Sequence, residues 1–246
     1  MLNTVSYDSD GTAPPLLIAH GLFGSARNWG VIARRLSDRG PVSAVDMRNH
    51  GDSFWSDDHS YPAMAGDLAE VIDGQWDVLG HSMGGKAAMT LALMHPGKVR
   101  RLVVADIAPV AYGHSQSHLI EAMRGVDPTC ESRAEARAQL AVRDEGVAAF
   151  LLQSLDRKEG RWRLNLDVLE REMDGITGWH GPEGRFEGEV LFLSGGESDY
   201  VRPEHRETIQ ALFPKARFVS LPGTGHWLHA ESPRDFETTV RLFLDK

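Results

Sequence analysis

The stretch GHSMG at residues 80–84 constrains the fold of this chain more than any other segment. It matches G-x-S-x-G, a pattern in which a serine occupies a sharp turn between a strand and a helix. Side chains two positions before and after that serine would clash, so glycine is needed at both. An apolar run at residues 76–80 precedes the turn, and an alanine-rich run at residues 83–95 follows it. We therefore predict a strand–turn–helix unit that exposes the Ser82 hydroxyl.

Short apolar runs alternate with helix-like segments around this unit. Such alternation predicts an α/β fold, with a mostly parallel sheet and helices on both of its faces. The predicted strands are residues 16–20, 42–46, 77–80, 101–106, 189–194 and 216–221. The predicted helices are residues 26–36, 61–72, 83–95 and 203–213, and a last helix that buries Phe236, Val240, Phe243 and Leu244.

The alternation stops between residues 111 and 188, where no strong strand pattern occurs. Residues 131–143 and 145–155 have helical patterns, and residues 161–166 could form a short strand. We therefore expect a core domain of residues 1–110 and 189–246 that carries a mostly helical cap insertion at residues 111–188.

The composition of the chain indicates which classes of binding partner it disfavours. The net charge of −9 disfavours nucleic acid, because phosphate binding needs clustered lysines and arginines. No apolar run approaches the roughly 20 residues that span a bilayer. The single cysteine, Cys130, and an N-terminus unlike a signal peptide favour a cytoplasmic protein. Neither metal-ligand spacing nor a phosphate-binding glycine pattern occurs, so we expect no metal and no cofactor.

A serine hydroxyl becomes a nucleophile only when a base removes its proton. Among the histidines, His226 follows the predicted strand 216–221 across a glycine-rich loop and precedes the last helix. That position would bring its imidazole to the carboxyl edge of the sheet, beside Ser82. His229 is three residues further on and is the alternative base.

The base needs a carboxylate that fixes its tautomer and stabilises its charged form. Two aspartates qualify. Asp106 ends one predicted strand, and Asp199 follows the strand at residues 189–194. Both lie at carboxyl ends of parallel strands, where sites of this fold class are built. An attacked carbonyl also needs backbone donors, and we expect them at Met83 and in the loop at residues 20–24.

Five motifs together resemble the α/β-hydrolase superfamily and, more narrowly, the YbfF-type esterases. They are HGLFGSARNW at 20–29, DMRNHGDS at 46–53, GHSMGG at 80–85, ADIAPV at 105–110 and GTGHWLHAESP at 223–233. The resemblance implies an α/β-hydrolase fold with a helical cap inserted after the sixth strand. It also implies a Ser-His-Asp esterase in which Ser82 is the nucleophile and His226 the base.

The resemblance also implies the remaining roles. The second backbone donor would be Leu22, with Phe23 as the alternative. The acid would be Asp106, the aspartate of the D-I-A-P-V motif. In most of the superfamily the acid stands three residues before a valine; here that position is Ser198, and Asp199 stays as the alternative acid one residue later.

Taken together, these features predict a serine hydrolase that cleaves a small carboxylic ester, or an acyl-thioester, through an acyl-enzyme. A ligand-binding receptor with slow or absent turnover is an alternative on the same fold. A haloperoxidase or a C–C hydrolase would use the same triad. A substrate pocket should lie between cap and core, and its candidate lining residues are Phe23, Phe150, Trp162, Trp179 and Trp227. The sequence does not indicate an oligomeric state.

Overall fold

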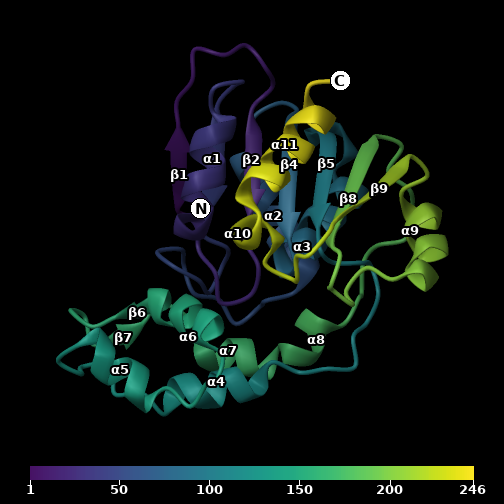
Figure 1. The fold of residues 1–246 in the computed structure, drawn as a ribbon. Coiled ribbons are helices and arrows are strands. Elements are labelled where there is room, and N and C mark those ends of the chain that lie inside the picture. Colours follow the sequence, from purple (N-terminus) through teal and green to yellow (C-terminus); the bar gives the residue numbers. More distant parts are fainter.

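The computed structural model describes residues 1–246 and is built on a seven-stranded sheet of order β1-β3-β2-β4-β5-β8-β9 (Figure 1). Its strands are β1 (Thr4–Tyr7), β2 (Leu16–Ala19), β3 (Val42–Val45), β4 (Trp76–His81), β5 (Val99–Ala105), β8 (Glu189–Gly195) and β9 (Ala216–Leu221). Every neighbouring pair is parallel except β1 and β3. The six predicted strands and the mostly parallel sheet are confirmed. The sequence analysis missed β1, a short edge strand that lies half exposed.

Alternate residues of the central strands pack into two separate hydrophobic clusters, one on each face of the sheet. In β5, Leu102 and Val104 join one cluster, and Val103 and Ala105 join the other. Both faces are therefore buried, which explains why these strands read as continuous apolar runs.

Helices cover both faces of the sheet (Figure 1). On one face α1 (Gly30–Leu36) packs with α11 (Pro233–Leu244), and α11 buries the four predicted residues. On the other lie α2 (Tyr61–Val71), α3 (Met83–Met94) and α9 (Arg206–Leu212). Short helical turns complete the core: η1 (Ala26–Trp29), η2 (Pro96–Lys98), η4 (Pro203–His205) and α10 (Leu228–Glu231).

Residues 111–188, called the inserted segment below, lie beyond the carboxyl ends of the parallel strands (Figure 1). Their elements are α4 (Ser117–Arg124), α5 (Arg133–Gln139), α6 (Glu145–Leu151), η3 (Leu152–Ser154), β6 (Leu155–Asp156), β7 (Arg161–Trp162), α7 (Leu166–Arg171) and α8 (Met173–Thr177). The predicted strand at 161–166 is shorter than expected, because Leu164 makes only an isolated bridge with His50 and α7 then begins.

Backbone hydrogen bonds join the inserted segment to the loop that follows β3. Gly51 N–H donates to Arg163 O at 2.8 Å, and Asn165 N–H donates to Asn49 O at 3.0 Å. The inserted segment is thus attached to the core at this loop as well as through its own two ends. None of the helices combines the length and apolar character needed to cross a membrane.

Candidate active site

Ser82 occupies a strained turn between β4 and α3, with φ 53° and ψ −120°. Such a positive φ is rare for a residue with a side chain. A Cβ at Gly84 would overlap the carbonyl oxygens of Ala19 and His20, and a Cβ at Gly80 would overlap Gly84 O. The predicted strand–turn–helix unit is present, and close backbone approaches explain both of its flanking glycines.

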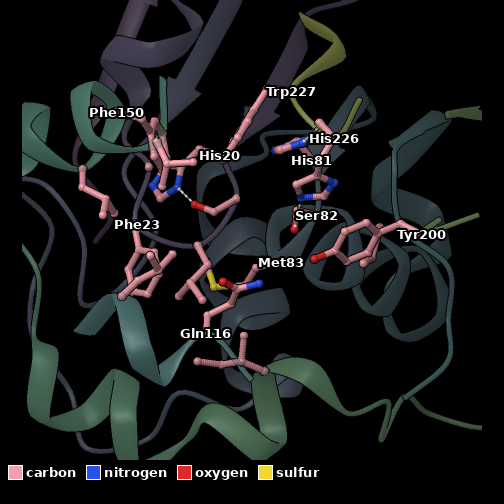
Figure 2. A pocket seen from close by; sticks show the side chains of 18 of the residues that line it. His20, Phe23, His81, Ser82, Met83, Gln116, Phe150, Tyr200, His226 and Trp227 are labelled. Carbon is pink, nitrogen blue, oxygen red and sulfur yellow. Dashed lines mark hydrogen bonds between the residues drawn. The ribbon is translucent and has the colours of Figure 1, made fainter. Parts of the chain in front are cut away.

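Two hydrogen bonds connect Ser82, His226 and Asp106. Ser82 Oγ lies 3.0 Å from Nε2 of His226, and Nδ1 of the same ring lies 2.7 Å from Oδ2 of Asp106. Figure 2 shows the His226 ring and the Ser82 hydroxyl at the edge of one pocket. Because Nδ1 faces a carboxylate, the ring proton belongs on Nδ1, and Nε2 is free to accept the serine proton.

The fold directs the Asp106 carboxylate, and not that of Asp199, toward His226. Asp106 is fully buried at the end of β5, and its Oδ1 accepts Gly195 N–H at 3.0 Å. The Asp199 side chain is 89% exposed and lies 3.7 Å from Arg202. Of the two aspartates that the sequence left open, only Asp106 reaches the imidazole.

Ser198, at the position where the resemblance to the superfamily would place an acid, contacts Asp106 instead. Its Oγ donates to Oδ2 of Asp106 at 2.5 Å, so that oxygen is shared with His226. The sequence analysis treated Ser198 only as a missing aspartate. Its position in the loop after β8 was the available signal.

The alternative base, His229, makes no hydrogen bond to Ser82, although it also lines the cavity described below. It is buried and stacks on Trp29 with a centroid distance of 4.1 Å. Burial lowers the pKa of His229 to about 3, with a smaller effect from His226. His229 is therefore a neutral aromatic packing residue.

Two further aromatic residues contact His226, one at its ring and one at its backbone. Tyr200 stacks on it with a centroid distance of 4.1 Å (Figure 2). His81 Nε2 donates to the backbone oxygen of His226 at 2.9 Å, which ties the residue before the serine to the histidine loop. Neither contact was predicted, since both depend on loops that meet only in the folded chain.

The two candidate donors in the loop after β2 have different surroundings. Phe23 N–H donates to Nε2 of His50 at 3.2 Å. Leu22 N–H has no acceptor within the protein. Met83 N–H lies at the first position of α3, where a helix leaves its amides without intrahelical partners. Leu22 and Met83 therefore keep their backbone N–H groups available.

A cavity of about 480 Å³ opens beside Ser82 and His226, with walls from both the core and the inserted segment. Phe23, Phe150 and Trp227 line it, as expected. Trp162 and Trp179 do not, which corrects two of the predicted lining residues.

Packing elsewhere in the molecule explains both corrections. Trp162 is buried within the inserted segment, where its indole N–H donates to Met123 O at 3.0 Å. Trp179 packs near Tyr61, with ring centroids 6.4 Å apart.

Lys86 lies at the cavity without a carboxylate partner. Its Nζ donates to Thr177 O at 2.8 Å and to Gly178 O at 2.5 Å, at the end of α8 in the inserted segment. Burial lowers the pKa of Lys86 to about 7. No group of three or more His, Cys, Asp or Glu side chains is arranged to hold a metal ion.

A model of the alpha/beta hydrolase family matches residues 16–239, so the chain belongs to that family. The sn-1-specific diacylglycerol lipase ABHD11 of Mus musculus is 42% identical over 254 residues, which cover 96% of this chain and 83% of the relative. Esterase YbfF of Escherichia coli (strain K12) is 40% identical over 241 residues, which cover 94% and 93%.

Among solved structures, one described as a marine microorganism esterase superposes with a TM-score of 0.93. It is 37% identical, and the match covers 98% of each chain. These relatives confirm the resemblance to the YbfF-type esterases that the five motifs indicated.

Proposed function

We propose that this protein hydrolyses carboxylic esters through an acyl-enzyme, with Ser82, His226 and Asp106 as its triad. The observation that carries the proposal is the pair of hydrogen bonds at 3.0 Å and 2.7 Å that joins the three side chains beside the cavity. Similarity to named esterases supports the same reaction class.

In the first half of the reaction, His226 Nε2 takes the hydroxyl proton as Ser82 Oγ attacks the ester carbonyl. The tetrahedral intermediate collapses, and His226 returns the proton to the departing alcohol oxygen. Asp106 keeps the ring in the Nδ1–H tautomer and stabilises the imidazolium. Water then attacks the acyl-enzyme with the same base, which releases the acid and regenerates Ser82.

The negative charge that develops on the carbonyl oxygen is stabilised by the backbone N–H groups of Leu22 and Met83. We assign Leu22 in preference to Phe23, because the Phe23 N–H is already bonded to His50. Donors placed in advance at the oxyanion contribute about 10²–10³ each to turnover in a serine protease.

The inserted segment acts as a cap that closes one side of the acyl site. Its contributions to the cavity wall include the apolar residues Leu119, Val142, Val147, Phe150 and Leu151. A volume of about 480 Å³ falls within the usual range for small-molecule sites. We propose esters with an apolar acyl chain as substrates; the name of the mouse relative, a diacylglycerol lipase, suggests that lipid esters be tested.

A serine-directed organophosphate tests the proposal. The wild-type protein should be labelled once, at Ser82, and should release product continuously from a chromogenic short-chain ester. Ser82→Ala should lose both labelling and turnover. A receptor would instead bind the ester without sustained release, and that result would contradict the proposal. A panel of esters and thioesters of varied chain length then defines the acyl preference.

A further inference from the structure

The loop after β2 forms a tight turn over residues 21–24, closed by a hydrogen bond from Gly24 N–H to Gly21 O at 3.0 Å. Phe23 stands at the third position of this turn with φ 63°. That position normally takes glycine or asparagine, because the left-handed region is unfavourable for other side chains. A phenylalanine stays there only when its surroundings hold it.

The first peptide of the turn, between Gly21 and Leu22, is held by His20. His20 Nε2 accepts Met47 N–H at 2.9 Å, so the ring proton is on Nδ1, which donates to Gly21 O at 2.7 Å (Figure 2). The C=O and N–H of one peptide point in opposite directions. Fixing the Gly21 carbonyl therefore fixes the direction of the Leu22 N–H.

The second peptide, between Leu22 and Phe23, is held by His50. Phe23 N–H donates to His50 Nε2, and His50 Nδ1 donates to Arg48 O at 2.9 Å. His50 is fully buried, and this burial, with smaller effects from His20 and His59, lowers its pKa well below the usual value. A neutral imidazole keeps the lone pair on Nε2 that this amide needs.

The third peptide, between Phe23 and Gly24, is held from the inserted segment. Ser154, at the end of η3, donates from Oγ to Phe23 O at 3.1 Å and is only 7% exposed. This is the only hydrogen bond of its hydroxyl. A residue 131 positions further along the chain therefore holds the same strained turn.

We propose that His50 and Ser154 are positioning residues for the oxyanion donor Leu22, so that the inserted segment takes part in catalysis by holding the turn from outside the core. This inference rests on the proposed ester hydrolysis. It makes the contact between the inserted segment and the turn a requirement for full transition-state stabilisation, separate from substrate binding.

Ser154→Ala tests the contact, and Gln153→Ala is its matched control. Gln153 is exposed and makes the neighbouring contact to the core, in which its Oε1 accepts Asn28 Nδ2 at 2.7 Å outside the turn. We expect Ser154→Ala to lower kcat about 10-fold with KM within about twofold, because one hydrogen bond that orients the donor is lost. Gln153→Ala should stay within about twofold of wild type in both.

A trifluoromethyl ketone separates positioning from general loss of structure. Ser82 Oγ adds to its carbonyl while the serine proton moves to His226, and the adduct places an oxyanion at the proposed donors. Its affinity should weaken with Ser154→Ala in parallel with kcat, while thermal unfolding stays close to that of Gln153→Ala. Ser154→Thr, which keeps the hydroxyl, should recover most of both values.

If Ser154→Ala does not fold, substitutions at residue 50 decide the question. His50→Gln retains an acceptor for Phe23 N–H and should keep more kcat than His50→Leu, which has none. An active wild-type enzyme in which Ser154→Ala matches Gln153→Ala, or His50→Leu matches His50→Gln, overturns this inference alone. A wild-type protein that neither hydrolyses esters nor labels at Ser82 overturns the proposed function and this inference with it.

Discussion

Ser198 Oγ lies 2.5 Å from Oδ2 of Asp106, the same oxygen that accepts the Nδ1 proton of His226. Two donors therefore converge on one carboxylate oxygen. A hydrogen bond to a charged acceptor is stronger than one between neutral groups, so Ser198 restricts how the carboxylate can turn.

Ser198→Ala should consequently lower kcat about 10-fold, because the buried carboxylate loses one charge-assisted bond and gains freedom to rotate. Ser220→Ala is a suitable control, since Ser220 is exposed on the edge strand β9 and does not contact Asp106. Steady-state kinetics on one ester would measure both. Equal rates for the two variants would show that Ser198 does not support the acid.

Asp106→Asn should reduce turnover by about 10⁴, the loss seen when the triad aspartate of a serine protease becomes an amide and the histidine adopts the wrong tautomer. Asp199→Asn should be nearly silent, because its side chain is 89% exposed and makes no contact with His226. The kcat of each purified variant provides the comparison. A large loss with Asp199→Asn and a small one with Asp106→Asn would reverse the assignment.

Gly84→Ala should destabilise the protein by about 3 kcal/mol or more, since its Cβ would overlap two backbone carbonyl oxygens that cannot move independently of β2. Gly66→Ala provides the contrast. Gly66 lies within α2 with open space around it, so alanine there should stabilise by about 0.5–1 kcal/mol. Chemical denaturation of the two variants measures the free energy of unfolding, which should fall for Gly84→Ala and rise for Gly66→Ala. A stable Gly84→Ala protein would show that the turn can relax.

The depressed pKa of Lys86 should make the free energy of unfolding increase as the pH rises above 7. Its pKa is about 7 in the folded chain and 10.5 in the ordinary case, so between these values the unfolded state binds the extra proton. Raising the pH through that window then favours folding, by less than about 1.4 kcal/mol per pH unit. Lys86→Met lacks the proton and should show a flatter dependence. Denaturant titrations from pH 7 to 9 compare the slopes, and parallel slopes would contradict the prediction.

The strands and the serine turn could be predicted because the pattern of a few adjacent residues determines each of them. A strand buried on both faces is an unbroken apolar run, and the turn needs its two glycines whatever surrounds it. β1 lacks such a signal, because its alternate residues are exposed at the edge of the sheet. α4 was also missed; short helices depend on tertiary packing more than on local pattern.

Within the candidate site, the local sequence pointed to Ser82 and His226 but left two aspartates open. Asp106 ends one predicted strand and Asp199 follows another, and only the course of the loops decides which carboxylate reaches the ring. The same limit applies to the cavity wall. Phe150 and Trp162 are both large apolar residues of the inserted segment, and the sequence does not tell which faces the cavity.

Ser82 follows β4 and Asp106 follows β5, so the proposed nucleophile and the proposed acid belong to one β–α–β crossover on neighbouring parallel strands. That continuous stretch of chain is complete before the inserted segment begins. Ribosomal synthesis therefore delivers two of the three members of the proposed triad together, before β8 joins the sheet and its Gly195 N–H binds the Asp106 carboxylate. The loop after β8 therefore needs to supply no carboxylate, and its Ser198 instead provides a hydroxyl donor to Asp106.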